Sequence, residues 1–346
     1  MIVDKKMNCP ICRESASFWR TLSDRTYEVT RFEASYYRCP SCHVVFMHPV
    51  PERSEIERFY PTGYWQEGSS DAFLTRVERF YSRTMLRLDL LAWLKKASRG
   101  MPSHLSYLDI GCSRGELLLD ASKLGFHVTG LEGDSRAVQF ARDQYGLDII
   151  HGDVETWRPR SSYHLISAFH VLEHLRDPAA FLRQLHGCLH SQGRLLLRVP
   201  NIDSWQAQVM KEKWKGLEAP RHLSHFSPRG LVRLLTNSGY KLLVQSTWSL
   251  RDGPPALTSS LCMSGEPTYQ AITGKKSLFL KLFYLQLNWA LTPIELIASL
   301  FGQGGMITII AEKQSCSNTD RDVDFDLMTM NETVQKNSAE KNTGEK

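Results

Sequence analysis

Four cysteines near the start of the sequence have the spacing of metal ligands. They form two Cys-x-x-Cys turns, at residues 9–12 and 39–42, about one hairpin apart. Four thiolates in two such turns can surround one Zn²⁺ ion tetrahedrally, and a site with four protein ligands has no open position for catalysis. A pair of redox-active or merely buried cysteines is the alternative, and the doubled motif argues against it. We predict a structural zinc ribbon over residues 1–50, with the ligands Cys9, Cys12, Cys39 and Cys42.

A second set of residues could move protons. The set consists of His170, Glu173, His174, His222 and His225. The first three follow a predicted strand, and the other two stand just before a predicted helix. An imidazole, whose ordinary pKa is about 6.5, suits a general base near neutral pH. We expect His174 to be this base with Glu173 assisting it, and His222 and His225 to be the next candidates.

The pair Glu173-His174 also has a purely structural interpretation. It could cap the next turn and shape a pocket without taking part in any chemistry. A metal site is a further alternative, but the spacing of these histidines is not a ligand pattern on one element. We therefore assign no metal to them.

A glycine-rich turn and two acids indicate a site for a nucleoside. Gly111 and Gly115 follow a short apolar run and can adopt the positive φ that lets backbone approach a ligand closely. The helix predicted behind them offers unpaired N–H groups, although an ordinary connecting loop would look the same. A second strand ends in Glu132, where a βαβ unit holds ribose hydroxyls. A third strand is followed by Asp153, whose carboxylate could accept a hydrogen bond from an adenine amine.

The elements that position these residues are short apolar runs that alternate with helical patterns. The runs predicted to be strands are residues 107–110, 127–131, 148–150, 165–169, 194–199, 241–248 and 306–311. Asp177-Pro178 and Ser227-Pro228 are signals for helix starts. An insertion at residues 205–217 is expected to roof the pocket. The alternation predicts an α/β fold, in which functional residues lie beyond the C-terminal ends of the strands.

Five stretches together resemble one family. LDIGCSRGELL, GLEGD, GDVE, FHVLEHLRDP and GRLLLRVPN are similar to motifs of the class I S-adenosylmethionine-dependent methyltransferases, over about residues 105–312. The resemblance implies a doubly wound, Rossmann-like sheet of seven mostly parallel strands, with an antiparallel last strand and S-adenosylmethionine above the strand ends. It implies that the cofactor is bound by Asp109, Gly111, Ser113, Gly115, Glu132, Asp153, Val154 and His170. Ser113 stands where the family usually has a second glycine, and serine is small enough for close approach.

The resemblance also implies a reaction, the attack of a nucleophile on the sulfonium methyl group. The N-terminal half resembles zinc-ribbon methyltransferases that act on sugars and other metabolites, in which a tyrosine-bearing segment lies near the substrate. We expect a small-molecule acceptor, such as a hydroxyl of a sugar, lipid or related metabolite, with Tyr64 and Trp65 as a lid. Phe59 and Tyr60 are expected to pack the ribbon onto the catalytic domain. The alternatives are a non-catalytic cofactor-binding adaptor and an RNA methyltransferase.

Composition sets broad bounds on partners and location. The chain has 346 residues and a formal net charge of +5, too mild a balance to demand a nucleic acid as partner. The start MIVDKKMNCP has no apolar signal segment, so we expect a cytoplasmic protein. We divide the chain into the ribbon (1–50), a linker and amphipathic helix (51–104), a methyltransferase domain (105–313) and a disordered tail (314–346).

One segment of the methyltransferase domain is unusually apolar. Residues 250–303 are predicted as a helical insertion, and within it residues 278–301 are almost continuously apolar. Five residues interrupt the run: Lys281, Gln286, Asn288, Pro293 and Glu295. It is therefore too polar to span a membrane, and we expect a helical hairpin packed on the domain. Contact with a membrane surface or a lipid substrate through 278–301 is the alternative.

Overall fold

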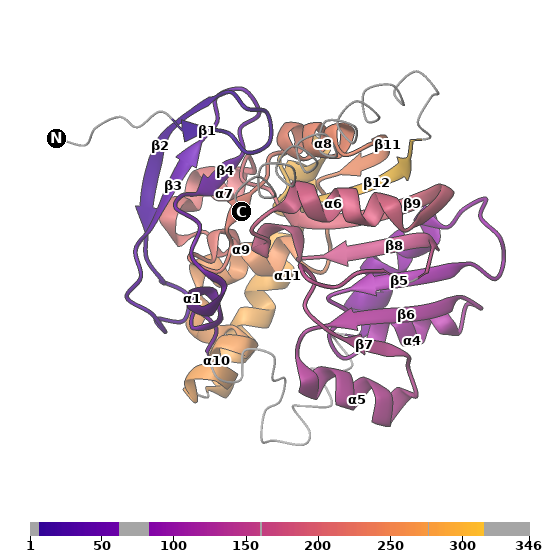
Figure 1. Ribbon diagram of the computed structural model, residues 1–346. Helices are drawn as coiled ribbons and strands as arrows, with labels where there is room; N and C mark the ends of the chain where they lie inside the picture. The colour runs from indigo at the N-terminus through magenta and orange to yellow at the C-terminus, as the bar shows by residue number, and fades with distance from the viewer. Residues whose placement is uncertain (1–6, 62–82, 160, 276, 315–346) are drawn as a thin grey trace, which may run out of the picture. The chain divides into compact units, whose positions relative to one another are not determined.

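The computed structural model describes residues 7–61, 83–159, 161–275 and 277–314, and its larger sheet has seven strands (Figure 1). Across the sheet they are β11 (Tyr240–Ser246), β12 (Met306–Lys313), β9 (Leu189–Pro200), β8 (Tyr163–Phe169), β5 (Ser106–Ile110), β6 (His127–Glu132) and β7 (Ile149–His151). β12 runs antiparallel to both of its neighbours, and the pairs from β9 to β7 are parallel. The predicted fold class is confirmed, including the antiparallel last strand.

Helices cover both faces of this sheet. One face packs against α6 (Pro178–Gly187) and α8 (Pro228–Asn237). The other packs against η1 (Arg87–Leu91), α3 (Ala92–Ala97), α4 (Glu116–Ser122) and α5 (Ser135–Tyr145). Strands that are buried on both faces need apolar side chains at nearly every position, which explains the continuous apolar runs in the sequence.

The predicted helix starts are confirmed by their caps. Asp177 accepts a hydrogen bond from the N–H of Ala180 at the start of α6. Ser227 accepts one from the N–H of Gly230 at the start of α8, and a proline occupies the first turn of both helices. These caps fix the points at which the chain turns back along the sheet.

A smaller sheet joins the N-terminal segment to the rest of the chain. Its strands, in order, are β1 (Met7–Asn8), β2 (Ser15–Leu22), β3 (Ala34–Arg38), β4 (Val45–Met47) and β10 (Ser224–His225). β10 comes from far along the sequence and pairs antiparallel with β4. Backbone hydrogen bonds thus join the ribbon to the chain segment that follows β9.

The insertion expected to roof the pocket lies elsewhere. It forms α7 (Trp205–Met210), η3 (Lys211–Lys213) and η4 (Lys215–Leu217). Trp214 is buried in a cluster with Tyr36 and Val45 of the ribbon. The expectation of a roof is wrong, because the apolar side chains of this insertion are used to pack the ribbon.

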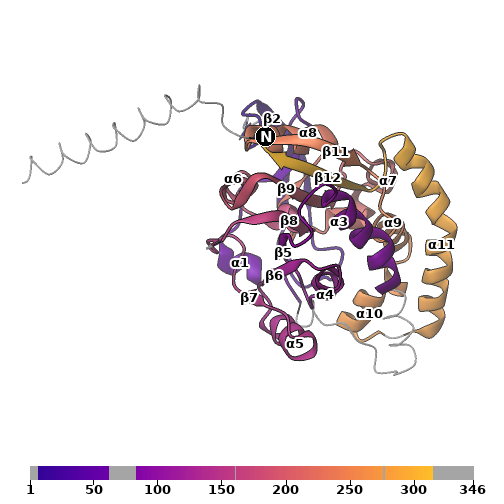
Figure 2. The same cartoon turned by 90° about the vertical axis from the view of Figure 1, so that its right-hand side faces the viewer.

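The apolar insertion forms helices, but not the expected hairpin within residues 278–301. Its elements are α9 (Gly253–Leu261), η5 (Met263–Gly265), α10 (Pro267–Thr273) and α11 (Leu278–Leu300). α11 is one continuous helix with Pro293 inside it, and it packs on α9 (Figure 2). Within the described residues, no helix is long and apolar enough to cross a membrane. Tyr64, Trp65, the first part of the predicted amphipathic helix and residues 315–346 lie outside the described residues.

Candidate active site

A cavity of about 1150 Å³ opens beyond the C-terminal ends of the central strands. The chain segments that follow β5, β6, β7 and β8 all reach its wall. The predicted site residues that line it are Asp109, Gly111, Ser113, Glu132, Asp153, Val154, His170 and His174. Gly115 is instead the N-cap of α4, with φ of +79°, and Glu173, His222 and His225 lie outside the lining. The strand ends thus bring the predicted acids and the glycine turn into one hollow.

The glycine turn has the geometry that its sequence predicts. Gly111 has φ of +68°, and a Cβ atom there would lie 2.8 Å from Cγ2 of Val171. Ser113, at the position where a glycine was expected, also adopts a positive φ, +50°. The turn therefore keeps its left-handed backbone despite the serine, at the cost of some local strain.

The acid at the end of β6 is held by the same turn. Oε2 of Glu132 accepts a hydrogen bond from the N–H of Ser113 at 2.8 Å, and Oε1 accepts one from the N–H of Asp134 at 2.9 Å. The carboxylate is buried but lines the cavity. Two backbone donors fix its position, so it can present its remaining lone pairs to hydroxyl groups.

Asp153 has a partner that the sequence did not reveal. Nη2 of Arg53 lies 2.5 Å from Oδ2 of Asp153. Arg53 begins α1 (Arg53–Glu57), just after the ribbon, and lines the cavity. The linker from the ribbon therefore supplies one wall of the site, which a reading of local motifs could not predict.

Asp109, at the end of β5, is buried beside polar neighbours. The hydroxyl of Ser167 donates to its Oδ1, and the hydroxyl of Tyr107 contacts Ser167 at 2.7 Å. Burial raises the pKa of Asp109 to about 7, although these hydroxyl groups oppose the shift. A cationic group in the cavity would favour its ionised form.

A buried charge network lies behind His170. Its Nε2 is 3.3 Å from Asp252 and its Nδ1 is 3.4 Å from Glu173. Burial alone would favour the neutral ring, but the two carboxylates outweigh it and raise the pKa of His170 to about 9. Because φ of His170 is +57°, the backbone is also strained at this cavity position.

The same network fixes an arginine that no sequence motif singles out. Arg198 is fully buried and donates to Asp89, at 2.6 and 3.1 Å, and to Asp252 at 2.8 Å. Asp89 also accepts the backbone N–H of Arg251 at 2.8 Å. Arg251 lines the cavity, and among the described residues its side chain makes one ion pair, with Asp252, at 3.8 Å. That distance is too long for a hydrogen bond, so its donors remain available to a ligand.

His174 is the histidine of the Glu173-His174 pair that reaches the cavity. Its Nδ1 lies 3.2 Å from the carbonyl oxygen of Arg221 and 3.1 Å from the hydroxyl of Tyr60. A carbonyl only accepts hydrogen bonds, so we assign the proton to Nδ1 and the lone pair to Nε2. Tyr60 packs against His174 of the catalytic domain, as expected, and it also lines the cavity, whereas Phe59 is buried against Phe32 of the ribbon.

His222 and His225 are packed behind His174. The rings of His222 and His174 lie 4.6 Å apart, and His222 contacts the carbonyl of Gly216 through Nδ1 at 2.9 Å. Burial, and then the neighbouring His174, lower the pKa of His222 to about 4, so its ring is neutral at pH 7. Both ring nitrogens of His225 are buried without a hydrogen-bond partner, and its ring packs on Tyr36.

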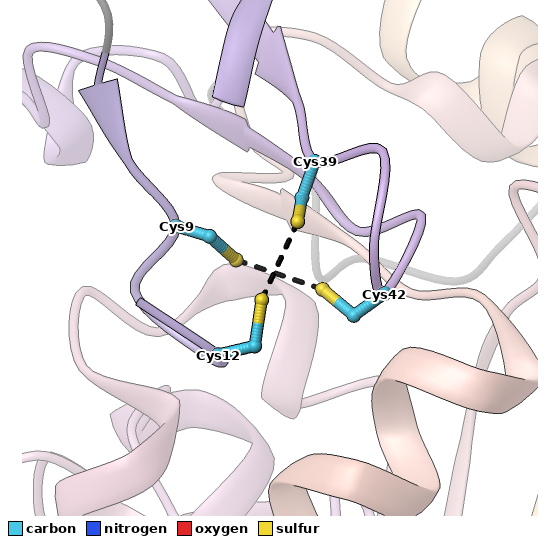
Figure 3. Close-up of side chains that lie close together, drawn as sticks. All are labelled: Cys9, Cys12, Cys39 and Cys42. Atoms are coloured by element: carbon cyan, nitrogen blue, oxygen red, sulfur yellow. Dashed lines mark hydrogen bonds between the residues drawn. The ribbon is translucent and has the colours of Figure 1, made fainter. Parts of the chain in front are cut away.

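The four ribbon cysteines converge on one point (Figure 3). Sγ of Cys9 is 3.6 Å from that of Cys42, and Sγ of Cys12 is 3.4 Å from that of Cys39. Around a tetrahedral Zn²⁺ ion with Zn–S bonds of about 2.3 Å, sulfur atoms lie about 3.8 Å apart. The four thiols therefore fit a closed zinc site, and each of these two pairs joins one predicted turn to the other.

The comparison with known families agrees with this geometry. Residues 74–245 match the model of a methyltransferase domain. In the larger sheet, the strand that comes last in the sequence, β12, runs antiparallel to its neighbours while the other pairs are parallel, as the resemblance implied. Residues 74–245 thus form a domain of the class I S-adenosylmethionine-dependent methyltransferases.

This methyltransferase has curated relatives that match part of their length. A mitochondrial ubiquinone biosynthesis O-methyltransferase of Schizosaccharomyces pombe is 31% identical over 119 residues, which are 32% of this chain and 43% of that protein. A trans-aconitate 2-methyltransferase of Acidovorax ebreus is 28% identical over 172 residues, 48% of this chain and 64% of that protein. The chain thus spans less than two thirds of the length of either relative.

A solved structure of Haemonchus contortus phosphoethanolamine N-methyltransferase 2 in complex with S-adenosyl-L-methionine is also similar. Its TM-score is 0.47 at 15% identity, and the match covers 65% of this chain and 52% of that one.

Proposed function

We propose that this methyltransferase transfers the methyl group of S-adenosylmethionine to a hydroxyl group of a small molecule, such as a sugar, a lipid or a related metabolite. The observation that carries the proposal is the single cavity that holds both the predicted cofactor residues and His174. The name of the Schizosaccharomyces pombe relative, an O-methyltransferase, supports oxygen as the acceptor atom.

The residues of the cavity fit the parts of the cofactor. Glu132 would bind the ribose hydroxyls and Asp153 would lie beside the adenine, where it shares its charge with Arg53. Asp109 and Gly111 would hold the amino acid moiety, and Arg251 would bind its carboxylate. When bound, the cofactor supplies an activated methyl group on a sulfonium, so the protein needs mainly to align the acceptor and exclude water.

The acceptor proton would be taken by His174. With its proton held on Nδ1 by the carbonyl of Arg221, Nε2 is the nitrogen that can accept. Tyr60, within hydrogen-bond distance of the same ring, would fix its orientation on the acceptor side of the cavity. Glu173 would act from behind, because its carboxylate is buried and does not line the cavity.

The zinc ribbon would contribute structure and no chemistry. Its four cysteines would occupy all four coordination positions of a tetrahedral Zn²⁺ ion. Through β4 and β10 it would hold the segment that carries Arg221 and His222 against the cavity. Tyr64 and Trp65 remain proposed lid residues on the strength of their sequence alone.

The test uses the whole protein with isotope-labelled S-adenosylmethionine and a metabolite extract. An enzyme should produce a labelled metabolite whose mass has increased by one methyl group. The variant His174→Gln should lose about 100-fold or more in turnover while its affinity for S-adenosylhomocysteine, measured by calorimetry, is unchanged. Gly111→Val should lose that affinity by at least about tenfold.

The outcomes separate the rival functions. Cofactor binding without any labelled product would indicate an adaptor without turnover. Label recovered in RNA would indicate an RNA methyltransferase, and its substrate affinity should then rise steeply as salt is lowered. Absence of cofactor binding by the unaltered protein would refute the proposal altogether.

A further inference from the structure

The helix α11 has its polar and apolar faces reversed relative to an ordinary surface helix. Three of its side chains are buried against the domain: Tyr284, Asn288 and Glu295. The hydroxyl of Tyr284 contacts that of Ser259 at 3.0 Å, and Asn288 accepts from Thr258 at 3.2 Å. Two of the five residues that interrupt the apolar run, Asn288 and Glu295, are therefore among those that anchor the helix.

Glu295 is the strongest of these anchors. It is fully buried and accepts hydrogen bonds from Nε2 of Gln206, at 2.6 Å, and from the backbone N–H of Gly305. These contacts tie α11 to α7 and to the turn before β12. These contacts fix the orientation of α11 about its axis. The side of the helix opposite Glu295 therefore points away from the domain.

That opposite face is exposed and almost entirely apolar. Its large exposed side chains are Leu278, Phe279, Leu282, Phe283, Trp289, Ile294, Leu296, Ile297, Leu300 and Phe301. Phe279, Leu300 and Phe301 are 76%, 76% and 78% exposed. One polar side chain, Gln286, is exposed among them within the helix. Soluble proteins seldom leave an apolar patch of this length in water, so the face needs a partner.

The width of the exposed face favours a fluid partner over a packed helix. At about 100° per residue, these side chains spread over roughly 160° of the helix circumference. A neighbouring helix is usually met by an apolar stripe about 100° wide. Hydrocarbon chains can surround a broad convex face without a complementary shape. In Figure 2, α11 runs along one side of the described residues, where such a partner could reach it.

The charges around α11 point to the chemistry of that partner. The only acid of the helix is Glu295, which is buried, so its exposed face carries no negative charge. At the N-terminal end, Lys275 is exposed just before the helix, whereas the half-buried Lys281 lies on the side of Tyr284 and Asn288. Basic residues next to an apolar face favour anionic lipid headgroups.

We propose that α11 docks this methyltransferase on the surface of an anionic lipid bilayer. The helix lies in the plane of the membrane with its exposed face among the acyl chains, and Lys275, just before its N-terminal end, contacts the headgroups. It does not cross the bilayer. The proposal does not depend on the methyl acceptor, and it applies equally if the acceptor is water-soluble.

The experiment measures sedimentation of the full-length protein with vesicles. Phosphatidylcholine vesicles are compared with vesicles that also contain phosphatidylglycerol, and binding should be at least about tenfold stronger to the anionic ones. Phe279→Glu and Ile297→Glu should each reduce this binding by about tenfold or more. Lys275→Glu should remove most of the preference for phosphatidylglycerol.

A matched control separates the face of α11 from apolar exposure in general. Val209 of α7 is 64% exposed, so Val209→Glu makes the same change on a different element and should leave vesicle binding unaltered. Calorimetry with S-adenosylhomocysteine shows that each variant is folded, because none of these residues lines the cavity.

Three results would overturn the proposal. The α11 variants could bind vesicles as the unaltered protein does, or Val209→Glu could lose binding equally. The protein could also be a dimer without lipid that Phe279→Glu converts to a monomer. In that last case a second copy of the chain covers α11, and light scattering would show it.

Discussion

At the scale of single residues, Arg251 shows how a buried network serves an exposed side chain. Asp89 and Arg198 are buried and form no part of the cavity wall, yet they fix the backbone of Arg251. Arg251 lines the cavity together with Asp109 and Gly111, and its charge opposes the burial that raises the pKa of Asp109. A planar guanidinium is a suitable partner for a carboxylate, because it can donate two parallel hydrogen bonds.

This placement predicts a selective loss of affinity in Arg251→Ala. The variant should bind S-adenosylhomocysteine about tenfold or more weakly, because a charge-assisted hydrogen bond to the amino acid carboxylate is lost. Its affinity for 5′-methylthioadenosine, which lacks that carboxylate, should not change. Calorimetry with both ligands measures the difference. Arg176→Ala, which alters another cavity arginine, is the control, and an equal loss for both ligands would contradict the assignment.

His170 predicts a particular dependence of stability on pH. Its folded pKa of about 9 lies above the ordinary 6.5, so the folded state retains a proton that the unfolded state releases. Its contribution to the free energy of unfolding is thus full below pH 6.5 and is lost as the pH rises toward 9. Denaturant unfolding of the unaltered protein and of His170→Asn should differ most near pH 6 and converge toward pH 9. A constant difference across this range would show that His170 does not titrate as described.

The sequence predicted the cavity residues at strand ends and missed those that arrive from elsewhere. Glu132 and Asp153 stand at the ends of recognisable strands, so one rule located both, whereas Asp109, within β5, was predicted through the family resemblance. Arg53 and Arg251 lie in segments with no motif, and their positions depend on partners distant in the sequence. Local patterns contain no information about such contacts.

At the scale of elements, α11 shows why its sequence pattern misled. The prediction treated Asn288 and Glu295 as breaks in an apolar segment, and a hairpin followed from that. The spacing of Tyr284, Asn288 and Glu295 in fact places them on one side of a single helix, which can bury them because Thr258 and Gln206 supply hydrogen bonds. The helical periodicity places these three residues on one side of α11, but only their partners in the folded chain decide that this side is buried.

The ribbon predicts a large effect of metal removal. The unaltered protein should contain one zinc ion per chain, measured by elemental mass spectrometry. Chelation, or the substitution Cys39→Ser, should lower the melting temperature by about 10 °C and expose the ribbon to proteolysis, because its small sheets have little apolar core of their own. Cys262→Ser, at a cysteine outside the cluster, should have neither effect. A stable, protease-resistant ribbon after chelation would rule out a structural metal.

At the scale of the whole chain, the ribbon and the methyltransferase domain are joined by contacts between distant segments. β4 pairs with β10, and the cap residue Ser227 donates to the carbonyl of Cys42 at 2.6 Å. Residues almost two hundred positions apart form these contacts. The division of the chain at residue 50 could be proposed from composition, but the shared sheet could not be predicted.

Two of the ion pairs between these segments allow a matched comparison. Asp24 and Arg221 are both fully buried, with Nη2 of Arg221 2.7 Å from Oδ1 of Asp24. Arg38 and Asp203 also form a pair, but their side chains are 37% and 27% exposed. Removing one partner of a buried pair leaves an unpaired charge away from water, whereas an exposed charge is solvated.

We therefore expect Asp24→Asn to lower the free energy of unfolding by about 3 kcal/mol or more. Asp203→Asn should lower it by less than about 1 kcal/mol, and denaturant titration measures both.

The effect of Asp24→Asn should extend to the active site. Arg221 also donates to the carbonyl of Phe59 at 2.8 Å, and its own carbonyl contacts His174, so a displaced Arg221 disturbs both Tyr60 and the proposed base. Turnover should consequently fall in Asp24→Asn while affinity for S-adenosylhomocysteine is kept, because Glu132 and Gly111 make no contact with this pair.

Two outcomes would show that the ribbon is an appendage and does not support the acceptor side of the cavity. The two variants could lose equal stability, or Asp24→Asn could lose as much cofactor affinity as turnover.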